Sequence, residues 1–229
     1  MKNSDFDYRT QFGVDYHQAR RIPARAENWI SELRARKLQQ WIGSEDRVLE
    51  YGVGYGWNLA RLKCSKKVGF DLSPDLRASV EKKGIRFEDR EEALEEKGFD
   101  AVVVHHALEH IRNPQDCLRG LQRFVSAKGK LILQVPFERE KKYRRLRGND
   151  RAHHLSSWTP ASLCNLVRTT GWKLQSANLQ RFRFDRLAGT LNCRLGGGYM
   201  TFTLIHMIGL ALLPEYEVAL LAQPLSAAA

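Results

Sequence analysis

The chain has 229 residues, of which 43% are apolar, and this is enough to bury a hydrophobic core. Its formal charge of +11 favours anionic partners such as nucleic acid, a phosphorylated substrate or an acidic membrane surface, without choosing among them. No C-x-x-C pair occurs among its four cysteines, which argues against a disulfide framework or a structural zinc site and fits a reducing cytoplasm.

The first residues, MKNSDFDYRTQFG, contain no apolar segment typical of a signal peptide. The most apolar run, residues 200–213, is shorter than the about 20 residues that a membrane span needs. It predicts a buried core helix, with an interfacial membrane helix as the alternative. We therefore expect a cytoplasmic protein without a transmembrane segment, and the oligomeric state stays open.

Residues 1–43 are polar and basic with interspersed aromatic side chains, and they predict one or two helices. Short apolar runs then alternate with helical patterns. The expected strands are RVLEYG (47–52), KVGFDLS (67–73), GIRFED (84–89), FDAVVVHH (99–106) and KLILQVP (130–136). The fourth of these is nearly all β-branched, which indicates a strand buried on both faces.

Three helices are expected between and after these strands. One covers residues 74–83, and one covers 113–129, where apolar residues share a stripe and a glycine ends the pattern. The third begins with Thr159 as N-cap and Pro160 at its first position, and it closes on Gly171. Residues 173–182 and 215–224 predict a final, antiparallel pair of strands.

This alternation predicts an α/β protein with a Rossmann-like, doubly wound sheet of seven mostly parallel strands and a final antiparallel strand. Right-handed crossovers place the carboxyl ends of the strands along one edge, where ligands bind. We expect residues 1–43 to form a helical cap and residues 44–229 the main domain. Residues 184–213 are expected to form a lid-like insertion, with Met200, Phe202, Leu204, Met207 and Leu210 as its packing face.

A glycine-rich turn follows the first strand in VLEYGVGYGWNLARL (48–62). The dinucleotide fingerprint G-x-G-x-x-G would need glycine or alanine where Trp57 stands, and no G-K-[ST] of a P-loop follows. A G-x-G-x-G pattern alone is weak evidence. Its context is informative, because an aspartate, Asp71, ends the second strand 19 positions after Gly52.

In that context, LEYGVGYG resembles the first-strand turn of class I S-adenosylmethionine-dependent methyltransferases of the type 11 and type 12 kind. VGFDLSPD resembles their second-strand motif. Residues 99–136, FDAVVVHHALEHI through KLILQVP, resemble the block in which strand four, an acid–histidine pair and strand five follow in order, and HHLSSWTPASLCNLVRTTGW resembles the segment before their late helix. The resemblance spans residues 47–224 and implies S-adenosylmethionine as the cofactor. This ligand has no pyrophosphate, and glycines permit close backbone approach to its methionine arm.

The resemblance also implies which residues contact the cofactor. Glu50 would receive its ammonium group, Asp71 the ribose hydroxyls and Leu72 the adenine ring, while Asp89 would offer a polar contact to the adenine amine. Backbone at His105 and His106 would meet the methionine amine. The complete expected set is Glu50, Tyr51, Gly52, Gly54, Gly56, Asp71, Leu72, Asp89, His105 and His106.

Several histidines are candidates for acid–base chemistry, because methylation of a hydroxyl group needs a base with a pKa near neutrality. His154 matches a histidine common at that place in the family, and His110 is the second candidate. If a helix begins near residue 106, His106 and His110 share a face with Glu109. Packing, a substrate-facing role and a metal site are the alternatives for that group, and we expect no metal.

Two basic segments allow further interpretations. REKKYRRLRGNDR (139–151) predicts a solvated face or, through Arg144, Arg145 and Arg147, an anion clamp. The N-terminal set could close over the cofactor carboxylate or bind single-stranded RNA. It consists of Tyr8, Tyr16, Arg20, Arg21 and Arg25.

The sequence thus predicts a methyltransferase that modifies an oxygen or nitrogen of a small or glycan-like acceptor, with anionic and lipid-linked molecules among the candidates. An N/D-P-P-Y/F tetrapeptide, which many nucleic-acid amino methyltransferases carry after strand four, is replaced by HHAL. Methylation of nucleic acid, RNA included, is therefore a hypothesis that we do not favour. Two further hypotheses are methylation of a protein and a cofactor-binding module without catalysis.

Overall fold

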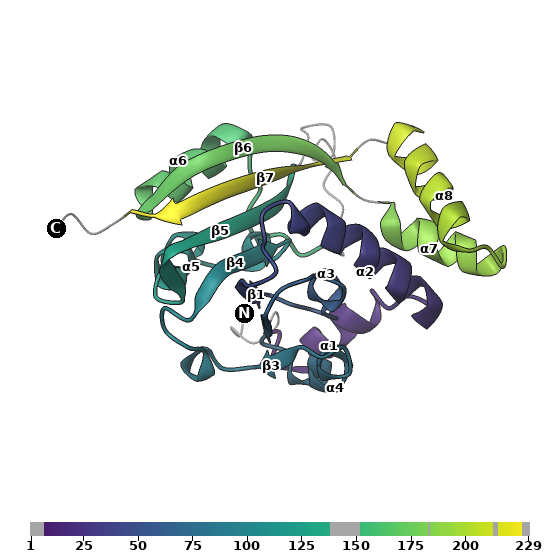
Figure 1. Cartoon of the computed structure of the whole chain (residues 1–229), viewed down its shortest axis with the longest axis horizontal. Helices are drawn as coiled ribbons and strands as arrows, with labels where there is room; N and C mark the ends of the chain where they lie inside the picture. Colours follow the sequence, from purple (N-terminus) through teal and green to yellow (C-terminus); the bar gives the residue numbers. More distant parts are fainter. Residues whose placement is uncertain (1–6, 138–151, 183, 213–214, 226–229) are drawn as a thin grey trace, which may run out of the picture. The chain divides into compact units, whose positions relative to one another are not determined.

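The computed structural model describes residues 7–137, 152–182, 184–212 and 215–225 (Figure 1). The strands are β1 (Arg47–Tyr51), β2 (Lys66–Phe70), β3 (Arg86–Glu88), β4 (Phe99–His105), β5 (Val125–Phe137), β6 (Trp172–Phe182) and β7 (Glu215–Pro224). The α-helices are α1 (Gln11–Gln18), α2 (Ala24–Gln39), α3 (Trp57–Ala60), α4 (Arg77–Glu81), α5 (Pro114–Leu121), α6 (Pro160–Thr169), α7 (Asp185–Arg194) and α8 (Tyr199–Leu212). Short 3-10 turns are η1 (Pro74–Leu76), η2 (Glu91–Ala93) and η3 (Leu108–His110).

The strands confirm the predicted fold class. They follow the order β3-β2-β1-β4-β5-β7-β6 in a mixed sheet. β1 pairs with β2, β2 with β3 and β4 with β5 in parallel, whereas β7 is antiparallel to both β5 and β6. The final antiparallel pair therefore lies where the sequence predicted it.

The chain divides into two compact units, which we describe separately. Unit 1 joins residues 1–94 to residues 183–214, and unit 2 joins residues 95–182 to residues 215–229. The residues predicted as an N-terminal cap and as a lid-like insertion both belong to unit 1. Their standing as a separate cap and as a lid stays a prediction.

Unit 1 is built around the three parallel strands β1, β2 and β3 and the long helix α2. Val48 and Leu49 of β1 are fully buried, as are Ala26 and Ile30 of α2. α2 packs against α3 and α7, as Figure 1 shows. This approach is close, because a Cβ added to Gly189 of α7 would lie 2.9 Å from the Cβ of Ala26. Gly189 and Ala26 thus allow α7 to lie close against α2.

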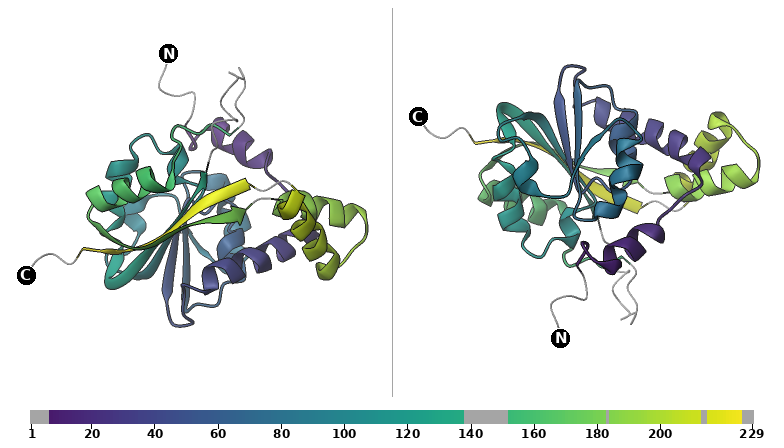
Figure 2. Two further views of the ribbon diagram at one scale, coloured as in Figure 1. Left: turned by 90° about the horizontal axis from the view of Figure 1, so that it is seen from above. Right: turned by 90° about the horizontal axis from the view of Figure 1, so that it is seen from below.

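Unit 2 contains β4, β5, β7 and β6, and helix α6 packs along β6 and β7 (Figure 2). The β4 segment 101–104 is fully buried, which confirms the prediction of a strand covered on both faces. The indole of Trp172 at the start of β6 donates a hydrogen bond of 2.9 Å to the backbone oxygen of Leu118 in α5. This bond joins the helix after β4 to the sheet.

The helix expected over residues 113–129 is shorter than predicted, because α5 ends at Leu121. The backbone after it takes other partners: the N–H of Lys97 donates to the oxygen of Arg123, and the N–H of Phe99 donates to the oxygen of Phe124. Phe124 and Val125 are still buried as the stripe requires. Strand pairing therefore ends the helix without changing which side chains enter the core.

No helix in the described parts of the chain combines the length and hydropathy that crossing a bilayer requires. The four cysteines, Cys64, Cys117, Cys164 and Cys193, are half-buried thiols that form no disulfide.

Thr159 is the N-cap of helix α6, as the sequence predicted, and it forms a capping box with Ser162. The Thr159 hydroxyl accepts a hydrogen bond of 3.1 Å from the N–H of Ser162, and the Ser162 hydroxyl accepts one of 2.9 Å from the N–H of Thr159. Thr159→Ala should lower the free energy of unfolding by about 1 kcal/mol in urea titrations, since it leaves a helix N–H without its cap. Thr169→Ala at the other end of the helix is the control and should change it by under about 0.5 kcal/mol. Equal effects of the two substitutions would contradict the role of the cap.

Candidate active site

The glycine-rich turn after β1 follows a backbone path that glycine alone adopts easily. Gly52, Gly54 and Gly56 all have positive φ angles, of 83°, 51° and 74°. A Cβ on Gly54 would meet nothing within 4 Å, whereas one on Gly56 would lie 2.9 Å from Ile85. Gly54 therefore borders open space, and Gly56 lets the turn pack closely on the core.

Asp71, the residue directly after β2, holds this turn. Its Oδ2 accepts a hydrogen bond of 2.9 Å from the N–H of Gly54, and its Oδ1 accepts one of 3.1 Å from the N–H of Ser73. Burial raises the pKa of this carboxyl group, while the nearby His17 and these N–H groups act to lower it. The first two strands thus meet at one carboxylate.

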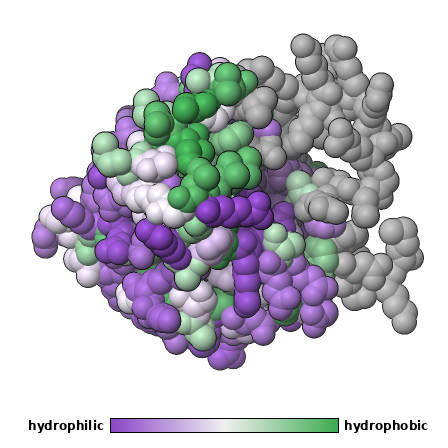
Figure 3. Space-filling view, turned by 90° about the vertical axis from the view of Figure 1, so that its right-hand side faces the viewer, coloured by the Kyte–Doolittle hydropathy of each residue, from purple (hydrophilic) through white to green (hydrophobic). Residues whose placement is uncertain are grey.

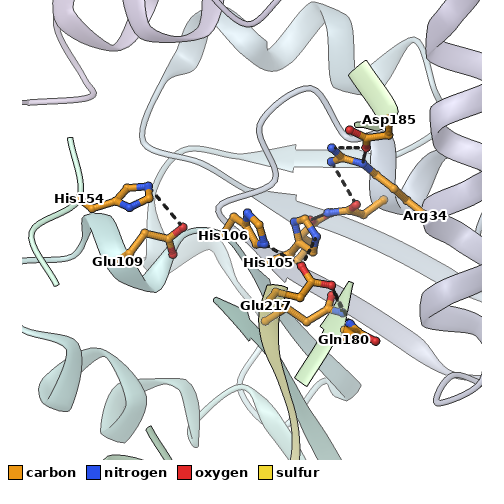
Figure 4. A network of polar contacts seen from close by, with 11 residues as sticks. Arg34, His105, His106, Glu109, His154, Gln180, Asp185 and Glu217 are labelled. Carbon is orange, nitrogen blue, oxygen red and sulfur yellow. Dashed lines mark hydrogen bonds and ion pairs between the residues drawn. The ribbon is translucent and has the colours of Figure 1, made fainter. Parts of the chain in front are cut away.

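Glu50, the fourth residue of β1, is completely buried and belongs to a polar chain within unit 1. The amide of Asn58 donates a hydrogen bond to Glu50 Oε1, and Arg34 Nη1 lies 3.5 Å from Asn58 Oδ1. Arg34 also pairs with Asp185 of α7 at 2.8 Å (Figure 4). This network of polar side chains thus connects β1, α3, α2 and α7.

Two carboxyl groups in this network of polar side chains have strongly shifted pKa values in opposite directions. Burial raises the pKa of Glu50 to about 8, even though the hydrogen bond from Asn58 acts to lower it. Burial alone would also raise the pKa of Asp185, but the paired Arg34 guanidinium lowers it to about 2. The Arg34 charge is therefore matched by Asp185, and Glu50 is left as the carboxyl group without a full counter-charge in this network.

Other predicted cofactor residues of unit 1 also have partners. The Tyr51 hydroxyl bonds to Glu91, and its ring packs on Phe70 with centroids 4.6 Å apart. Leu72 is half-buried beside Asp71. Asp89 forms an ion pair of 3.3 Å with Arg77, so a contact with adenine would have to share its carboxylate.

His17 of α1 is a site residue that the sequence analysis did not single out. Its Nε2 lies 3.8 Å from Asp71 Oδ1, and it is buried without a hydrogen-bond partner. Burial lowers its pKa, and the Asp71 charge acts to raise it. The residues singled out nearby are engaged elsewhere: Arg20 stacks on Tyr16 at 3.4 Å, and Arg21 donates to Tyr55 at 3.3 Å. No local sequence signal marks His17, since its partner is 54 positions away in the chain.

In unit 2, the two histidines at the end of β4 lie beside a buried glutamate of β7. His105 and His106 stack with ring centroids 4.3 Å apart, and His106 Nε2 is 2.8 Å from Glu217 Oε2. Gln180 of β6 donates to the other carboxylate oxygen at 2.7 Å. Glu217, which the sequence analysis missed, thus fixes the ring of His106 (Figure 4).

The expectation that His106 and His110 share a helical face with Glu109 is wrong. His106 has a φ angle of 52°, which breaks the backbone before any helix, and the following helical turn begins only at Leu108. The two histidines therefore join different carboxylates.

His110 and His154, the predicted catalytic residues, do lie together, with Glu109 as their shared acidic neighbour. Their rings meet edge to face at 5.1 Å, and His154 Nε2 is 4.0 Å from Oε1 of the buried Glu109. His110 Nδ1 lies 3.2 Å from the backbone oxygen of His153, so Nδ1 is the donor in this hydrogen bond. The N–H of Leu155 donates to the Glu109 backbone at 2.8 Å and holds this loop against η3.

Both histidine clusters offer donor atoms that a divalent transition metal accepts. One consists of His105, His106 and Glu217, and the other of Glu109, His110 and His154. The ligand atoms of each lie within 4.8 Å of one another. Imidazole and carboxylate groups in such proximity also suit proton transfer, so the donor set alone does not distinguish the two uses. The proposed anion clamp of Arg144, Arg145 and Arg147 lies outside the described residues.

Comparisons with known proteins agree with the fold and the turn geometry. A family model described as a methyltransferase domain matches residues 17–177, which is more than two thirds of the chain. One similar solved structure is a SAM-dependent methyltransferase of Thermotoga maritima, described as a possible histamine N-methyltransferase. The aligned region covers 96% of this chain and 99% of that protein, with a TM-score of 0.65 and 15% sequence identity. Comparison with curated protein sequences gave no match.

Two further solved structures have similar folds. The methyltransferase CalH, in complex with S-adenosylhomocysteine, has a TM-score of 0.55 at 17% identity and covers 85% of this chain and 54% of its own. The [4+2]-cyclase SpnF has a TM-score of 0.57 at 16% identity and covers 85% of this chain and 80% of its own. The similarity to SpnF shows that this fold is not restricted to proteins named for methyl transfer.

The Rossmann-like sheet and the family match point to the same class of protein, the methyltransferases. The chain belongs to the methyltransferase domain family, and it is an S-adenosylmethionine-dependent methyltransferase. Its residues fit that cofactor. Glu50 has a buried carboxylate oxygen, Oε2, without a hydrogen-bond partner, and Gly54 leaves open space where a side chain would stand.

Removal of the Asp71 charge tests whether the carboxylate beside this turn binds the cofactor. Asp71→Asn should weaken binding of S-adenosylhomocysteine by about tenfold to a hundredfold, because a hydrogen bond to a charged group is worth about 1.5–3 kcal/mol. Isothermal titration calorimetry measures the affinity. Asp75→Asn, an exposed position four residues later, should leave the affinity unchanged. Equal affinities of wild type and Asp71→Asn would show that this carboxylate does not hold the ligand.

The raised pKa of Glu50 predicts a pH dependence of stability. Between about pH 4.5 and 8, the folded protein keeps a proton on Glu50 that the unfolded chain has lost. Stability from this group is therefore complete below about pH 4.5 and decreases as the pH rises to about 8. In urea unfolding, the wild-type free energy should fall on the order of 1 kcal/mol per pH unit more steeply than that of Glu50→Gln. Glu45→Gln, at an exposed position, should keep the wild-type slope.

Proposed function

We propose that the turn of unit 1 holds the methionine arm and ribose of S-adenosylmethionine. The ammonium group would lie at Glu50, the ribose hydroxyls at Asp71 and the adenine beside Tyr51, Leu72 and Asp89. Gly52, Gly54 and Gly56 would allow the backbone to approach the ligand. Two features support these roles, namely the partnerless Oε2 of Glu50 and the open space at Gly54. His105 and His106, which the resemblance places near the methionine amine, stay part of this proposal.

We further propose that the acceptor is a small or glycan-like molecule with an oxygen or nitrogen nucleophile, anionic and lipid-linked molecules included. S-adenosylmethionine supplies an electrophilic methyl group, so the protein must align the nucleophile and remove its proton. His154 is the proposed base, and His110 is its partner. The proton would pass from the acceptor to the imidazole of His154.

One observation carries this assignment: His154 Nε2 lies 4.0 Å from the buried carboxylate of Glu109. A buried acid beside a histidine orients the ring and stabilises the imidazolium that forms when the ring takes a proton. The edge-to-face contact with His110 and the Leu155–Glu109 backbone bond keep the loop in place. The geometry therefore suits a histidine that is neutral before the reaction and charged after it.

His154→Ala should lower the turnover number by about a hundredfold to ten-thousandfold, the usual range for loss of a general base. Affinity for S-adenosylhomocysteine should stay at the wild-type value. The assay follows transfer of tritium from methyl-labelled S-adenosylmethionine to a panel of phenols, carboxylates, amines and amino sugars. The best acceptor of the wild type is then used for the variants. Ser157→Ala, in the same loop, is the matched control.

Unchanged turnover of His154→Ala would remove this residue from the mechanism.

The salt dependence of acceptor binding distinguishes a small acceptor from RNA. Contacts with many phosphates would weaken binding by orders of magnitude between low and moderate salt. A small acceptor should lose much less affinity over the same range.

A further inference from the structure

Helices α7 and α8 form a hairpin whose inner face packs on α2 within unit 1. Phe202 is fully buried and stacks on Trp29 with centroids 5.8 Å apart. Gly209 makes room for the ring of Phe184, because a Cβ there would lie 2.1 Å from that ring. Ala188 and Gly189 of α7 are buried against Ala26 and Ile30. The hairpin therefore already has a packed apolar side.

The outer face of the same hairpin is also apolar, and it is exposed. Figure 3 shows hydrophobic side chains gathered on the face of the molecule that carries these helices. Eight large hydrophobic residues of the hairpin are exposed: Leu187, Leu191, Leu195, Met200, Leu204, Met207, Ile208 and Leu212. The expected packing face is thus confirmed for Phe202 but wrong for Met200, Leu204 and Met207, which are 82%, 59% and 63% exposed.

These residues form a continuous stripe on each helix rather than a scatter. Leu187, Leu191 and the C-cap residue Leu195 are four positions apart along α7, so they share one side. On α8, the exposed residues Met200, Leu204, Met207, Ile208 and Leu212 lie on one side of the helix, opposite the buried Phe202 and His206. An exposed apolar stripe of this kind marks an interaction surface.

The charges around the stripes are mostly positive, although Arg36 is ion-paired with Glu32 of α2 at 2.9 Å. Asp185 is the single acidic residue in segment 185–212, and Arg34 pairs with it at 2.8 Å. Arg186 and Arg194 of α7 and Arg25 and Arg36 of α2 are exposed. The last two lie over aromatic rings that border the hairpin, Arg25 over Trp29 at 5.5 Å and Arg36 over Tyr199 at 5.6 Å. The rim therefore suits an anionic partner.

We propose that this face docks the enzyme on the surface of an anionic lipid bilayer, with α7 and α8 lying in the interface. Leucine and methionine stripes would enter the headgroup region, and the arginines would meet the lipid phosphates. Neither helix is long enough to cross the membrane. A second copy of this chain fits less well, since each copy carries a formal charge of +11 and would bring its own arginines against the other's.

The proposal is tested by co-sedimentation of the full chain with vesicles of phosphatidylcholine, with or without phosphatidylglycerol. We expect binding that increases with phosphatidylglycerol and decreases with salt. The double variant Leu204→Glu/Met207→Glu should weaken partitioning by about tenfold or more, because binding scales with the buried apolar area. The matched control is Leu179→Glu/Leu225→Glu, two exposed leucines of unit 2, which should bind like wild type.

Circular dichroism melting should give similar melting temperatures for the wild type and both double variants, since all four positions are exposed. If the hairpin variant, Leu204→Glu/Met207→Glu, did not fold, Arg194→Glu would serve as a second test. In that variant, vesicle binding should lose its dependence on phosphatidylglycerol. Absence of vesicle binding, or equal binding by the wild type and the hairpin variant, would overturn the proposal. Dimerisation of the wild type in light scattering, abolished in the hairpin variant without any vesicle binding, would assign the face to a second copy.

Discussion

The Asp71 carboxylate is the constraint on which unit 1 depends. Each of its oxygens accepts a backbone N–H, one from Gly54 in the turn after β1 and one from Ser73 after β2. The turn meets this carboxylate with positive φ angles at its three glycines, a conformation that glycine adopts without strain. A single buried acid thus shapes the turn, joins two strands and leaves a carboxylate beside the space that Gly54 keeps open.

A partly buried network of polar groups extends this arrangement away from the turn. Arg34 compensates the charge of Asp185, and Asn58 relays from Arg34 to Glu50 through one hydrogen bond on each side. The helix α7 is therefore fixed to α2 by electrostatics as well as by packing, and the protonation of Glu50 depends on residues that lie far from it in the chain.

The sequence was sufficient for features that local spacing determines and insufficient for those that depend on distant partners. The seven strands, the cap at Thr159 and the Gly52–Asp71 spacing are local, and the structure has them as predicted. By contrast, Asp185 stands 151 positions from Arg34, and Glu217 stands 111 positions from His106. The helix expected over 113–129 ended early for the same reason, because pairing with 97–99 outweighed a continuous apolar stripe. The left-handed conformation of His106 is a backbone event that no periodicity records.

The anchoring of the hairpin also distinguishes two explanations for its exposed stripes. A lid caught in an open state would show an apolar inner face with nothing packed on it, ready to fold over a ligand. Here the inner face is already occupied, with Phe202 stacked on Trp29 and Gly209 against Phe184. The Arg34–Asp185 pair fixes the start of α7 as well. The stripes therefore lie on the side of the hairpin that faces away from this packing, and exposed apolar area of this kind marks an interaction surface.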